Sequence, residues 1–282
     1  MKVTKIQGKL ELTNAGGLSL FFVGIGSAFS KMNFQNNVLF IKGKNHVLID
    51  CGTMCSFAIS HYGVKISDIE NFFLTHSHAD HIGGMEEVAF TDYYVKKARP
   101  TLIIDDQYKK VLWNESLRGG LGYSKTFSGK TAGFEDFFVQ QKPKKVKCGK
   151  HVYEHALVGG KGGIDLKFFR TNHSTAKSVS GKAFISKGVI VDDKILFTSD
   201  TRFNRKQIEQ ILADFDIEWI FHDVCNFKNE VHTSYEELNT LPAEIKKKIY
   251  LCHYDEGLMK KKPKQDGFAG FAKRGCYYNF DL

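Results

Sequence analysis

The amino-acid sequence predicts an α/β fold in which two β-rich halves pack on each other and helices cover their outer faces. Short runs of β-branched and aromatic residues recur in both halves of the chain, and segments with helical character lie between them. The chain has 282 residues, of which 42% are hydrophobic and 25% are charged. A chain of this length and composition buries a large core, which excludes disordered and fibrous architectures.

The first half of the chain contains apolar runs that are typical of buried strands. Residues 18–23 and 37–41 are such runs, and a glycine-containing break separates them. A third strand at 46–50 and a helix at 54–61 follow. The strand at 71–75 then leads directly into the segment of the chain that is richest in potential metal ligands.

The composition changes between residues 114 and 163, where glycines recur and five lysines fall within 142–150. We interpret this stretch as an insertion or lid on a single domain that spans 1–282, with a short helix over 134–140. Tyrosines and phenylalanines within the insertion are expected to form its own small core.

The strand pattern resumes after the insertion, and a capping box predicts the start of one further helix at either Thr233 or Ser234. The expected strands and the other helix cover residues 165–170, 178–185, 189–192, 195–198, 206–213 (the helix), 218–222 and 248–252.

The formal net charge of +9 and the pI near 9.1 favour anionic partners such as phosphates or nucleic acid. No apolar run of about 18 residues and no amino-terminal signal segment is visible. The six cysteines follow no regular spacing and include no Cys-x-x-Cys pair. We therefore expect reduced thiols in a cytoplasmic protein that does not contact membranes.

The strongest chemical signal is Thr75-His76-Ser77-His78-Ala79-Asp80-His81, which continues the strand at 71–75. Imidazole nitrogens and carboxylate oxygens are ligands that zinc and similar divalent ions accept. The alternation of a strand puts His76 and His78 on one side, and the following turn brings Asp80 and His81 toward a second direction. One loop can therefore serve two metal ions. The alternative is a polar loop that binds no metal. Histidine makes up only 11 of the 282 residues, so three histidines within six positions are improbable by chance.

Four residues cannot complete two coordination spheres, so other strand ends must supply further ligands. His173, Asp200 and His253 each lie just past an apolar run. Taken alone, such a residue is more often a cap or an exposed polar side chain. Beside the histidine-rich loop, we interpret all three as metal ligands.

These motifs make the chain resemble the metallo-β-lactamase superfamily of hydrolases, over nearly its whole length apart from the insertion. Two further segments add to the resemblance, Gly24-Ile25-Gly26-Ser27-Ala28-Phe29 and Leu48-Ile49-Asp50-Cys51-Gly52. The resemblance implies a four-layered αββα sandwich with a two-metal site at one edge of the sheets. Asp50 is similar to the family's buried aspartate, which orients the ligand loop. The alternative for Asp50 is a turn residue at a strand end.

The resemblance also assigns the ligands by position. Asp200 is similar to the bridging carboxylate. The other six fall into two groups, one metal held by His76, His78 and His173 and the second by Asp80, His81 and His253.

Two segments separate the branches of the superfamily. Phe221-His222-Asp223-Val224 resembles the His-Glu-Ala-Thr segment of ribonuclease Z and related phosphodiesterases, and Val231-His232-Thr233-Ser234 resembles their His-Ser-Thr segment. The resemblance implies that His232 is the general acid that protonates the leaving oxygen and that Asp223 is its partner. The match is looser here, because Asp replaces Glu and Thr-Ser replaces Ser-Thr. The alternative for His232 is a residue beside the capping box with no role in chemistry.

The position of the extra length argues against tRNA processing. In ribonuclease Z, an arm that grips tRNA lies between the third ligand histidine and the bridging aspartate. Here His173 and Asp200 are too close in sequence for such an arm. The chain therefore resembles arm-less relatives such as the cyclic-nucleotide phosphodiesterases, among them phage enzymes that degrade signalling nucleotides. We expect a metal-dependent phosphodiesterase that acts on a cyclic nucleotide or RNA.

The implied mechanism uses a hydroxide held between two divalent ions, with Asp80 orienting it and His232 protonating the departing ribose oxygen. Zinc is the expected metal, and manganese or iron would fit the same ligands. A thioester needs no such acid, so a thioesterase of the glyoxalase II type is one alternative. A tRNA 3′-processing endoribonuclease and a non-catalytic nucleotide-binding protein are two others. Relatives are often homodimers, and a homodimer is expected by resemblance only.

Overall fold

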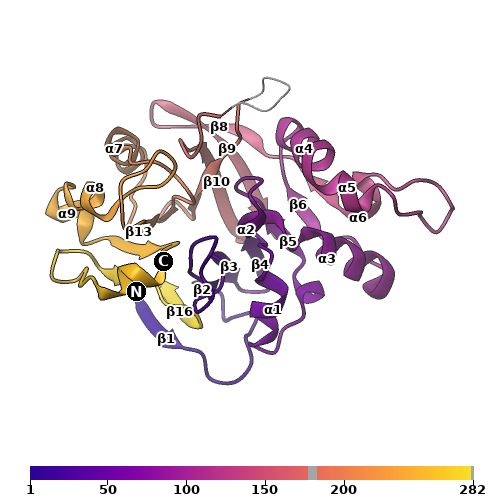
Figure 1. The fold of residues 1–282 in the computed structure, drawn as a ribbon, viewed down its shortest axis with the longest axis horizontal. Coiled ribbons are helices and arrows are strands. Elements are labelled where there is room, and N and C mark those ends of the chain that lie inside the picture. Colours follow the sequence, from indigo (N-terminus) through magenta and orange to yellow (C-terminus); the bar gives the residue numbers. More distant parts are fainter. Residues whose placement is uncertain (177–182, 281–282) are drawn as a thin grey trace.

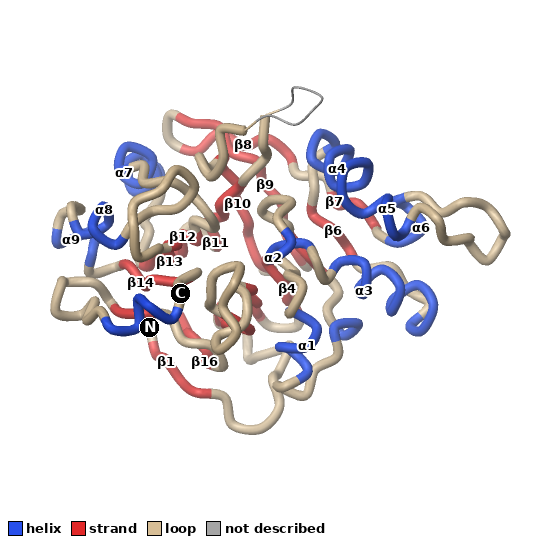
Figure 2. Tube along the Cα trace, in the orientation of Figure 1, coloured by secondary structure: helices blue, strands red, loops and turns tan. Residues whose placement is uncertain are grey.

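Two eight-stranded sheets lie face to face in the protein, whose structure is a computed structural model that describes residues 1–176 and 183–280. Helices cover the outer face of each sheet, so the chain forms four layers (Figure 1). The expected α/β sandwich of two β-rich halves is confirmed. Figure 2 shows the two groups of strands in the middle of the molecule and the helices at its sides.

The first sheet is built from the amino-terminal half and from the last strand of the chain, which pairs between the first two strands. It is antiparallel from β1 to β4 and parallel from β4 to β7. In pairing order its strands are β1 (Lys2–Lys5), β16 (Cys276–Phe280), β2 (Leu18–Gly24), β3 (Asn37–Lys42), β4 (Asn45–Ile49), β5 (Asn71–Phe73), β6 (Thr101–Ile103) and β7 (Val139–Gln141).

The second sheet repeats this plan with the other half of the chain. It is antiparallel from β8 to β12 and parallel from β12 to β15. In pairing order its strands are β15 (Gly270–Phe271), β14 (Ile249–Cys252), β13 (Trp219–Asp223), β12 (Ile195–Phe197), β11 (Lys187–Val191), β10 (Ile164–Arg170), β9 (His151–Val158) and β8 (Lys144–Cys148).

Short helices connect the strands. Those that pack on the first sheet include α1 (Cys55–Ser60), α3 (Met85–Phe90), α4 (Asp106–Leu112), α5 (Arg118–Leu121) and α6 (Phe134–Phe137). The second sheet is covered by α7 (Arg205–Asp214), α8 (Tyr235–Asn239) and α9 (Ala243–Lys246). The single-turn α2 (Ala79–Ile82) lies in the histidine-rich loop, and other single turns are the 3-10 helices Ile66–Asp68 and Glu256–Lys260 and the π-helices Thr91–Lys96 and Trp113–Leu117.

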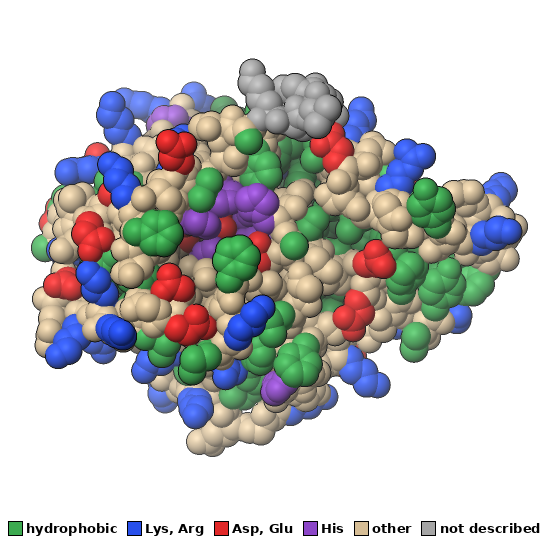
Figure 3. Space-filling view, in the orientation of Figure 1, with side chains coloured by type: hydrophobic (Ala, Val, Ile, Leu, Met, Phe, Trp, Pro, Cys, Tyr) green, Lys and Arg blue, Asp and Glu red, His purple; other side chains and the backbone are tan. Residues whose placement is uncertain are grey.

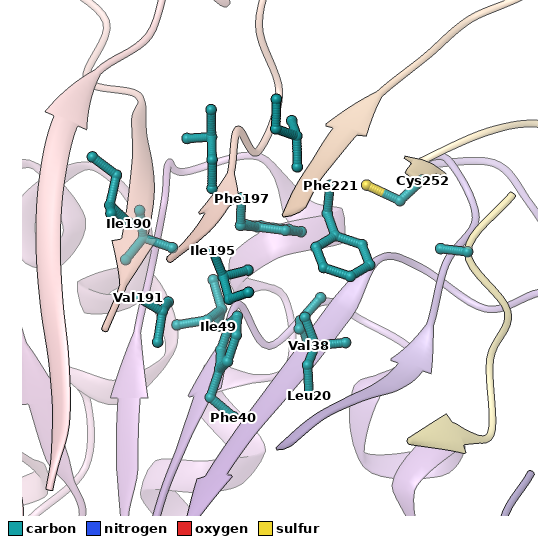
Figure 4. Packing of buried hydrophobic residues seen from close by; sticks show 14 of the residues in the cluster. Leu20, Val38, Phe40, Ile49, Ile190, Val191, Ile195, Phe197, Phe221 and Cys252 are labelled. Atoms are coloured by element: carbon teal, nitrogen blue, oxygen red, sulfur yellow. The ribbon is translucent and has the colours of Figure 1, made fainter. Parts of the chain in front are cut away.

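Strand alternation divides the hydrophobic residues of the first sheet between two layers of core. In β2, Leu20 and Phe22 point to the second sheet, whereas Phe21 and Val23 pack under the helices of their own side. Phe22 meets Phe221 of the second sheet with ring centroids 5.4 Å apart. Figure 4 shows this central layer, in which side chains from both sheets interdigitate. The continuous apolar runs read from the sequence are therefore strands buried on both faces.

The insertion expected over residues 114–163 is shorter than predicted. Residues 139–158 form β7, β8 and β9, which pair within the two sheets. The helix expected over 134–140 ends at Phe137 and is followed by β7. Lys144, Lys145 and Lys147 are exposed on the edge strand β8, where charge protects a sheet edge from pairing with another chain.

Two other expectations concern the second half. The strand expected over 178–185 lies mostly outside the described residues, and its last residues, 184 and 185, are not in a strand. The capping box belongs to Ser234, whose hydroxyl accepts from the Glu237 backbone NH while the Glu237 carboxylate accepts from the Ser234 backbone NH. This box begins α8.

Candidate metal centre and active site

All of the expected ligands lie at the carboxyl ends of strands on one edge of the sandwich. His76 follows β5, Asp200 follows β12 and His253 follows β14, and these strands belong to the parallel parts of the two sheets. Parallel strands bring their carboxyl ends to one edge, where loops supply functional groups. Figure 3 shows the result, a central patch of histidine side chains with acidic groups beside it on one face of the molecule.

Three strand-end residues at this edge adopt the left-handed backbone conformation. They are Asp50 (φ 64°), Ser199 (φ 52°) and His253 (φ 55°). A non-glycine residue in this region costs about 1 kcal/mol or more and persists only where its surroundings hold it. Two of these residues carry predicted site side chains, and the third directly precedes Asp200. The backbone is therefore turned sharply where ligands must face one point.

The first group of expected ligands consists of three imidazoles. His78 Nδ1 lies 3.0 Å from His76 Nε2 and 3.0 Å from His173 Nε2. Burial lowers the pKa of all three rings, most strongly that of His76, where the neighbouring His81 adds to the effect. Neutral imidazoles with converging nitrogens offer lone pairs to a metal ion.

The second group combines two carboxylates and two imidazoles. His81 Nε2 lies 3.2 Å from Asp80 Oδ2, and His253 Nε2 lies 3.3 Å from the same oxygen. Asp200 Oδ2 is 3.3 Å from His81 Nε2 and 3.4 Å from His253 Nε2. The same Asp200 oxygen is 3.9 Å from both His76 Nε2 and His173 Nε2, so it lies between the two groups.

The chemistry of this donor set fits divalent cations. Burial raises the pKa of Asp80 and Asp200, but the adjacent His81 and His253 outweigh it and hold both carboxyls ionised. Within residues 1–176 and 183–280, no hydrogen-bond partner is found for the buried atoms His81 Nε2 and Asp200 Oδ1. Buried polar atoms without a partner are costly, and a bound cation would satisfy the carboxylate and the imidazole lone pair together. The seven residues expected as ligands are thus brought together in two adjoining groups.

Asp50 is completely buried beneath the ligand loop and holds it in place. Its Oδ2 accepts from His81 Nδ1 at 2.7 Å, and its Oδ1 accepts from the Thr75 backbone NH at 2.7 Å. The Thr75 hydroxyl donates to Oδ2 at 2.9 Å. The bond to Nδ1 leaves His81 Nε2 free to point toward the carboxylates of Asp80 and Asp200. We propose that Asp50 orients the metal ligand His81, the role that such outer carboxylates have in metal sites.

Replacing Asp50 with asparagine is expected to weaken metal binding about 10- to 100-fold. The amide nitrogen would donate to His81 Nδ1 and so shift the imidazole proton to Nε2, the atom that faces the second group. Zinc affinity, measured by competition with a chelating dye, checks this result. Asp106→Asn on the exposed start of α4 is the matched control and should bind zinc like the wild type; equal weakening in both variants would contradict the role of Asp50.

The proposed acid and its partner also come together beside these ligands. His232 Nδ1 donates to Asp223 Oδ2 at 3.1 Å and lies 3.8 Å from Asp200 Oδ2. Burial lowers the pKa of His232, but the hydrogen bond to Asp223 and the charge of Asp200 outweigh it and raise the pKa to about 9. The His232 side chain is 22% exposed, whereas Asp223 is fully buried. A protonated imidazole therefore lies at the rim of the ligand cluster, backed by a buried carboxylate.

Some contacts of the site were not predicted from the sequence. The Phe184 ring packs against His78 with centroids 5.0 Å apart and also lies near His76 and His173. His173 Nδ1 donates to the Val231 backbone carbonyl at 2.8 Å. Thr75, which donates two hydrogen bonds to Asp50, lies directly before the first histidine of the motif, and this position could have indicated its role. No sequence signal marks Phe184 or the Val231 carbonyl, because both act through tertiary contact.

Comparison with known proteins places the chain in a family. Residues 18–278 match the family described as Anti-Pycsar protein Apyc1. The chain belongs to this family. The Anti-Pycsar protein Apyc1 of Bacillus phage BSP38 is 33% identical over 260 residues, which cover 91% of this chain and 96% of that protein. The Apyc1 protein of Paenibacillus sp. (strain J14) is 31% identical over 242 residues, which cover 86% and 91%.

Solved structures show the same fold at low sequence identity. The metallo-β-lactamase fold protein YhfI from Bacillus subtilis has a TM-score of 0.64 at 15% identity, covering 94% of this chain and 100% of its own. A diphosphatase of the PhnP family has a TM-score of 0.65 and the short form of human tRNase Z one of 0.60, each at 15% identity. This Apyc1-family chain therefore has the metallo-β-lactamase fold, which confirms the expected four-layered αββα sandwich.

Among the described residues, no helix combines the length and the hydrophobicity that crossing a bilayer requires.

Proposed function

We propose that this Apyc1-family protein is a metal-dependent phosphodiesterase that opens the phosphodiester ring of cyclic nucleotides. The observation that carries the proposal is the His232–Asp223 pair, 3.1 Å apart, at the edge of the two ligand groups. An alkoxide is a poor leaving group and needs a proton, whereas a thiolate leaves without one. A protonated imidazole beside the ligands therefore favours phosphodiesters over thioesters.

The chain's own residues divide the work between binding and proton transfer. The two groups around Asp200 would hold two divalent ions, which when bound supply an activated water and neutralise charge on the phosphate. We propose that Asp80 helps to orient that water from its place beside His81 and His253. His232 holds its proton at Nε2, because Nδ1 is engaged with Asp223, and passes it to the departing ribose oxygen.

The choice of a cyclic nucleotide rests on the short segment between His173 and Asp200 and on the relatives. The segment between His173 and Asp200 is too short for an arm that could hold a folded RNA. The relatives include Apyc1 proteins of Bacillus phages, which agrees with the resemblance to phage enzymes that degrade signalling nucleotides. RNA cleavage is the second candidate, which the net charge of +9 would support.

The proposal is tested with a substrate panel and metal-loaded protein. Adenosine and cytidine 3′,5′-cyclic phosphates, a short linear RNA, bis(p-nitrophenyl) phosphate and a glutathione thioester are compared by kcat/KM. The cyclic phosphates are expected to be the best biological substrates and to yield nucleoside monophosphates. Preference for the thioester would refute a phosphodiesterase, and preference for the linear RNA would replace the cyclic nucleotide by a nuclease substrate.

Three further properties are part of the proposal. We propose zinc as the bound metal because histidine and aspartate dominate the ligands, with manganese or iron as alternatives. We also propose a homodimer, based on the resemblance, and a cytoplasmic location, based on six free cysteines. Metal analysis and light scattering on purified protein would test the first two.

A further inference from the structure

Two exposed phenylalanines on loops joined to the ligand groups contact no other aromatic ring of the described residues. In the described part of the chain, six aromatic side chains are largely exposed: Phe29, Phe57, Tyr94, Tyr123, Phe127 and Phe227. Phe57, Tyr94 and Phe127 each pack against another ring. For Phe29, Tyr123 and Phe227, no contact with another described ring is found. Phe29 and Phe227 lie on loops joined to the ligand cluster.

The loop that carries Phe29 is anchored next to the ligand His253. The Ser27 backbone NH donates to the Tyr254 carbonyl at 3.1 Å, and the Ser30 hydroxyl donates to Glu256 Oε1 at 2.7 Å. Both partners lie within three residues of His253 in the chain. Between these two anchors, Phe29 is 87% exposed. The loop is thus held at both ends while its aromatic ring stands in solvent.

The loop that carries Phe227 is anchored at the proposed acid. Asn229 Oδ1 accepts from the backbone NH groups of Val231 and His232 at 2.9 and 2.7 Å, and Asn229 Nδ2 donates to the Phe227 carbonyl at 3.3 Å. The Val231 carbonyl in turn accepts from His173. Phe227 is 65% exposed.

Both loops meet the same short helix, Glu256–Lys260, which follows His253. The Phe29 loop reaches it through Ser30 and Glu256, and Asn33 Nδ2 lies 3.7 Å from Met259 Sδ. On the other side, a Cβ added to Gly257 would lie 3.8 Å from Asn226 Nδ2, next to Phe227. The two rings are therefore carried on neighbouring loops at the rim of the site, and apolar side chains border the histidine patch in Figure 3.

An aromatic ring exposed to water has an unfavourable hydration free energy, which a ligand that covers the ring would remove. Every nucleobase has a π-face that stacks on an aromatic ring, and such stacking needs no matching hydrogen bonds. A phosphate bound at the ligand groups leaves the base of a small nucleotide within the rim. We propose that Phe29 and Phe227 bind the base of the nucleotide substrate by stacking, an inference that rests on the proposed phosphodiesterase function.

The test compares substrates with and without a base. Adenosine 3′,5′-cyclic phosphate and methyl riboside 3′,5′-cyclic phosphate present the same phosphodiester ring, and only the first has a base to stack. Phe29→Ala and Phe227→Ala are each expected to lower kcat/KM for the adenosine compound about tenfold, mainly through KM. The methyl riboside should be turned over as by the wild type. Phe→Trp at either position should restore or tighten binding, and Phe→Leu should not.

Tyr123→Ala is the matched control, because Tyr123 is 90% exposed and contacts no other described ring. It follows α5, whereas Phe29 follows β2 and Phe227 follows β13. The variant should behave as the wild type. Equal losses on both compounds, unchanged KM for the adenosine compound, or a fall in molecular mass by light scattering would each overturn stacking; the last would assign the rings to a protein interface. A wild-type protein that cleaves the methyl riboside just as well refutes stacking but keeps the phosphodiesterase. A wild-type protein that cleaves neither cyclic phosphate refutes both the stacking and the phosphodiesterase function.

Discussion

Replacing His232 with alanine is expected to lower kcat for a cyclic nucleotide by about 10²- to 10⁴-fold, the usual contribution of a positioned general acid. The ribose alkoxide is then forced to leave without a proton. The two ligand groups should keep their metals, because His232 lies beside Asp200 at 3.8 Å and its own Nδ1 bond is made to Asp223. Steady-state turnover, with metal content measured on the same sample, checks both halves of the prediction.

A comparison of substrates with different leaving groups distinguishes loss of the general acid His232 from general damage to the site. Bis(p-nitrophenyl) phosphate releases a stable phenolate that needs little protonation, so His232→Ala should reduce its turnover far less. Asp223→Asn should resemble a milder form of the same defect, since the carboxylate whose hydrogen bond helps to raise the pKa of His232 is removed. Equal losses on the two substrates with both metals retained would rule out His232 as the acid.

The sequence was sufficient to predict which residues gather at the site, because the signal is local. His76, His78, Asp80 and His81 occupy six consecutive positions after one strand, and strand alternation already divides them between two directions. The partners His173, Asp200 and His253 were found because each follows an apolar run that had to be a buried strand. Strand ends on one sheet edge are brought together by topology alone.

What the sequence could not predict depends on contacts between distant segments. Asp50, Ser199 and His253 adopt the left-handed conformation, for which glycine is the usual sequence signal. None of the three is a glycine, so the sequence did not predict these conformations. The lysine-rich stretch at 142–150 was interpreted as part of an insertion because strand β8 has exposed lysines in place of an apolar face. Its partner β9 has the buried residues, and an edge strand needs few of its own.

Replacing Asp200 with alanine is expected to remove most of the bound metal and, with it, activity. Asp200 Oδ2 lies within 3.9 Å of four imidazoles that belong to both ligand groups, so neither group keeps a full ligand set without it. Loss of a carboxylate that only orients a ligand costs about 10- to 100-fold in metal affinity, and loss of a shared ligand should cost at least the upper end of that range. Elemental analysis of the purified variant measures the loss directly.

Thermal unfolding shows whether the metals and this carboxylate act as one unit. A metal that binds only the folded protein stabilises it, so a chelator should lower the Tm of the wild type. The same chelator should have little further effect on Asp200→Ala, because the metal has already been lost. If the alanine variant does not fold, Asp200→Asn, which keeps the side-chain volume, takes its place in the experiment. Asp106→Ala on the protein surface is the control and should retain full metal content. A metal-replete, active Asp200→Asn variant would show that Asp200 is not shared between the two groups.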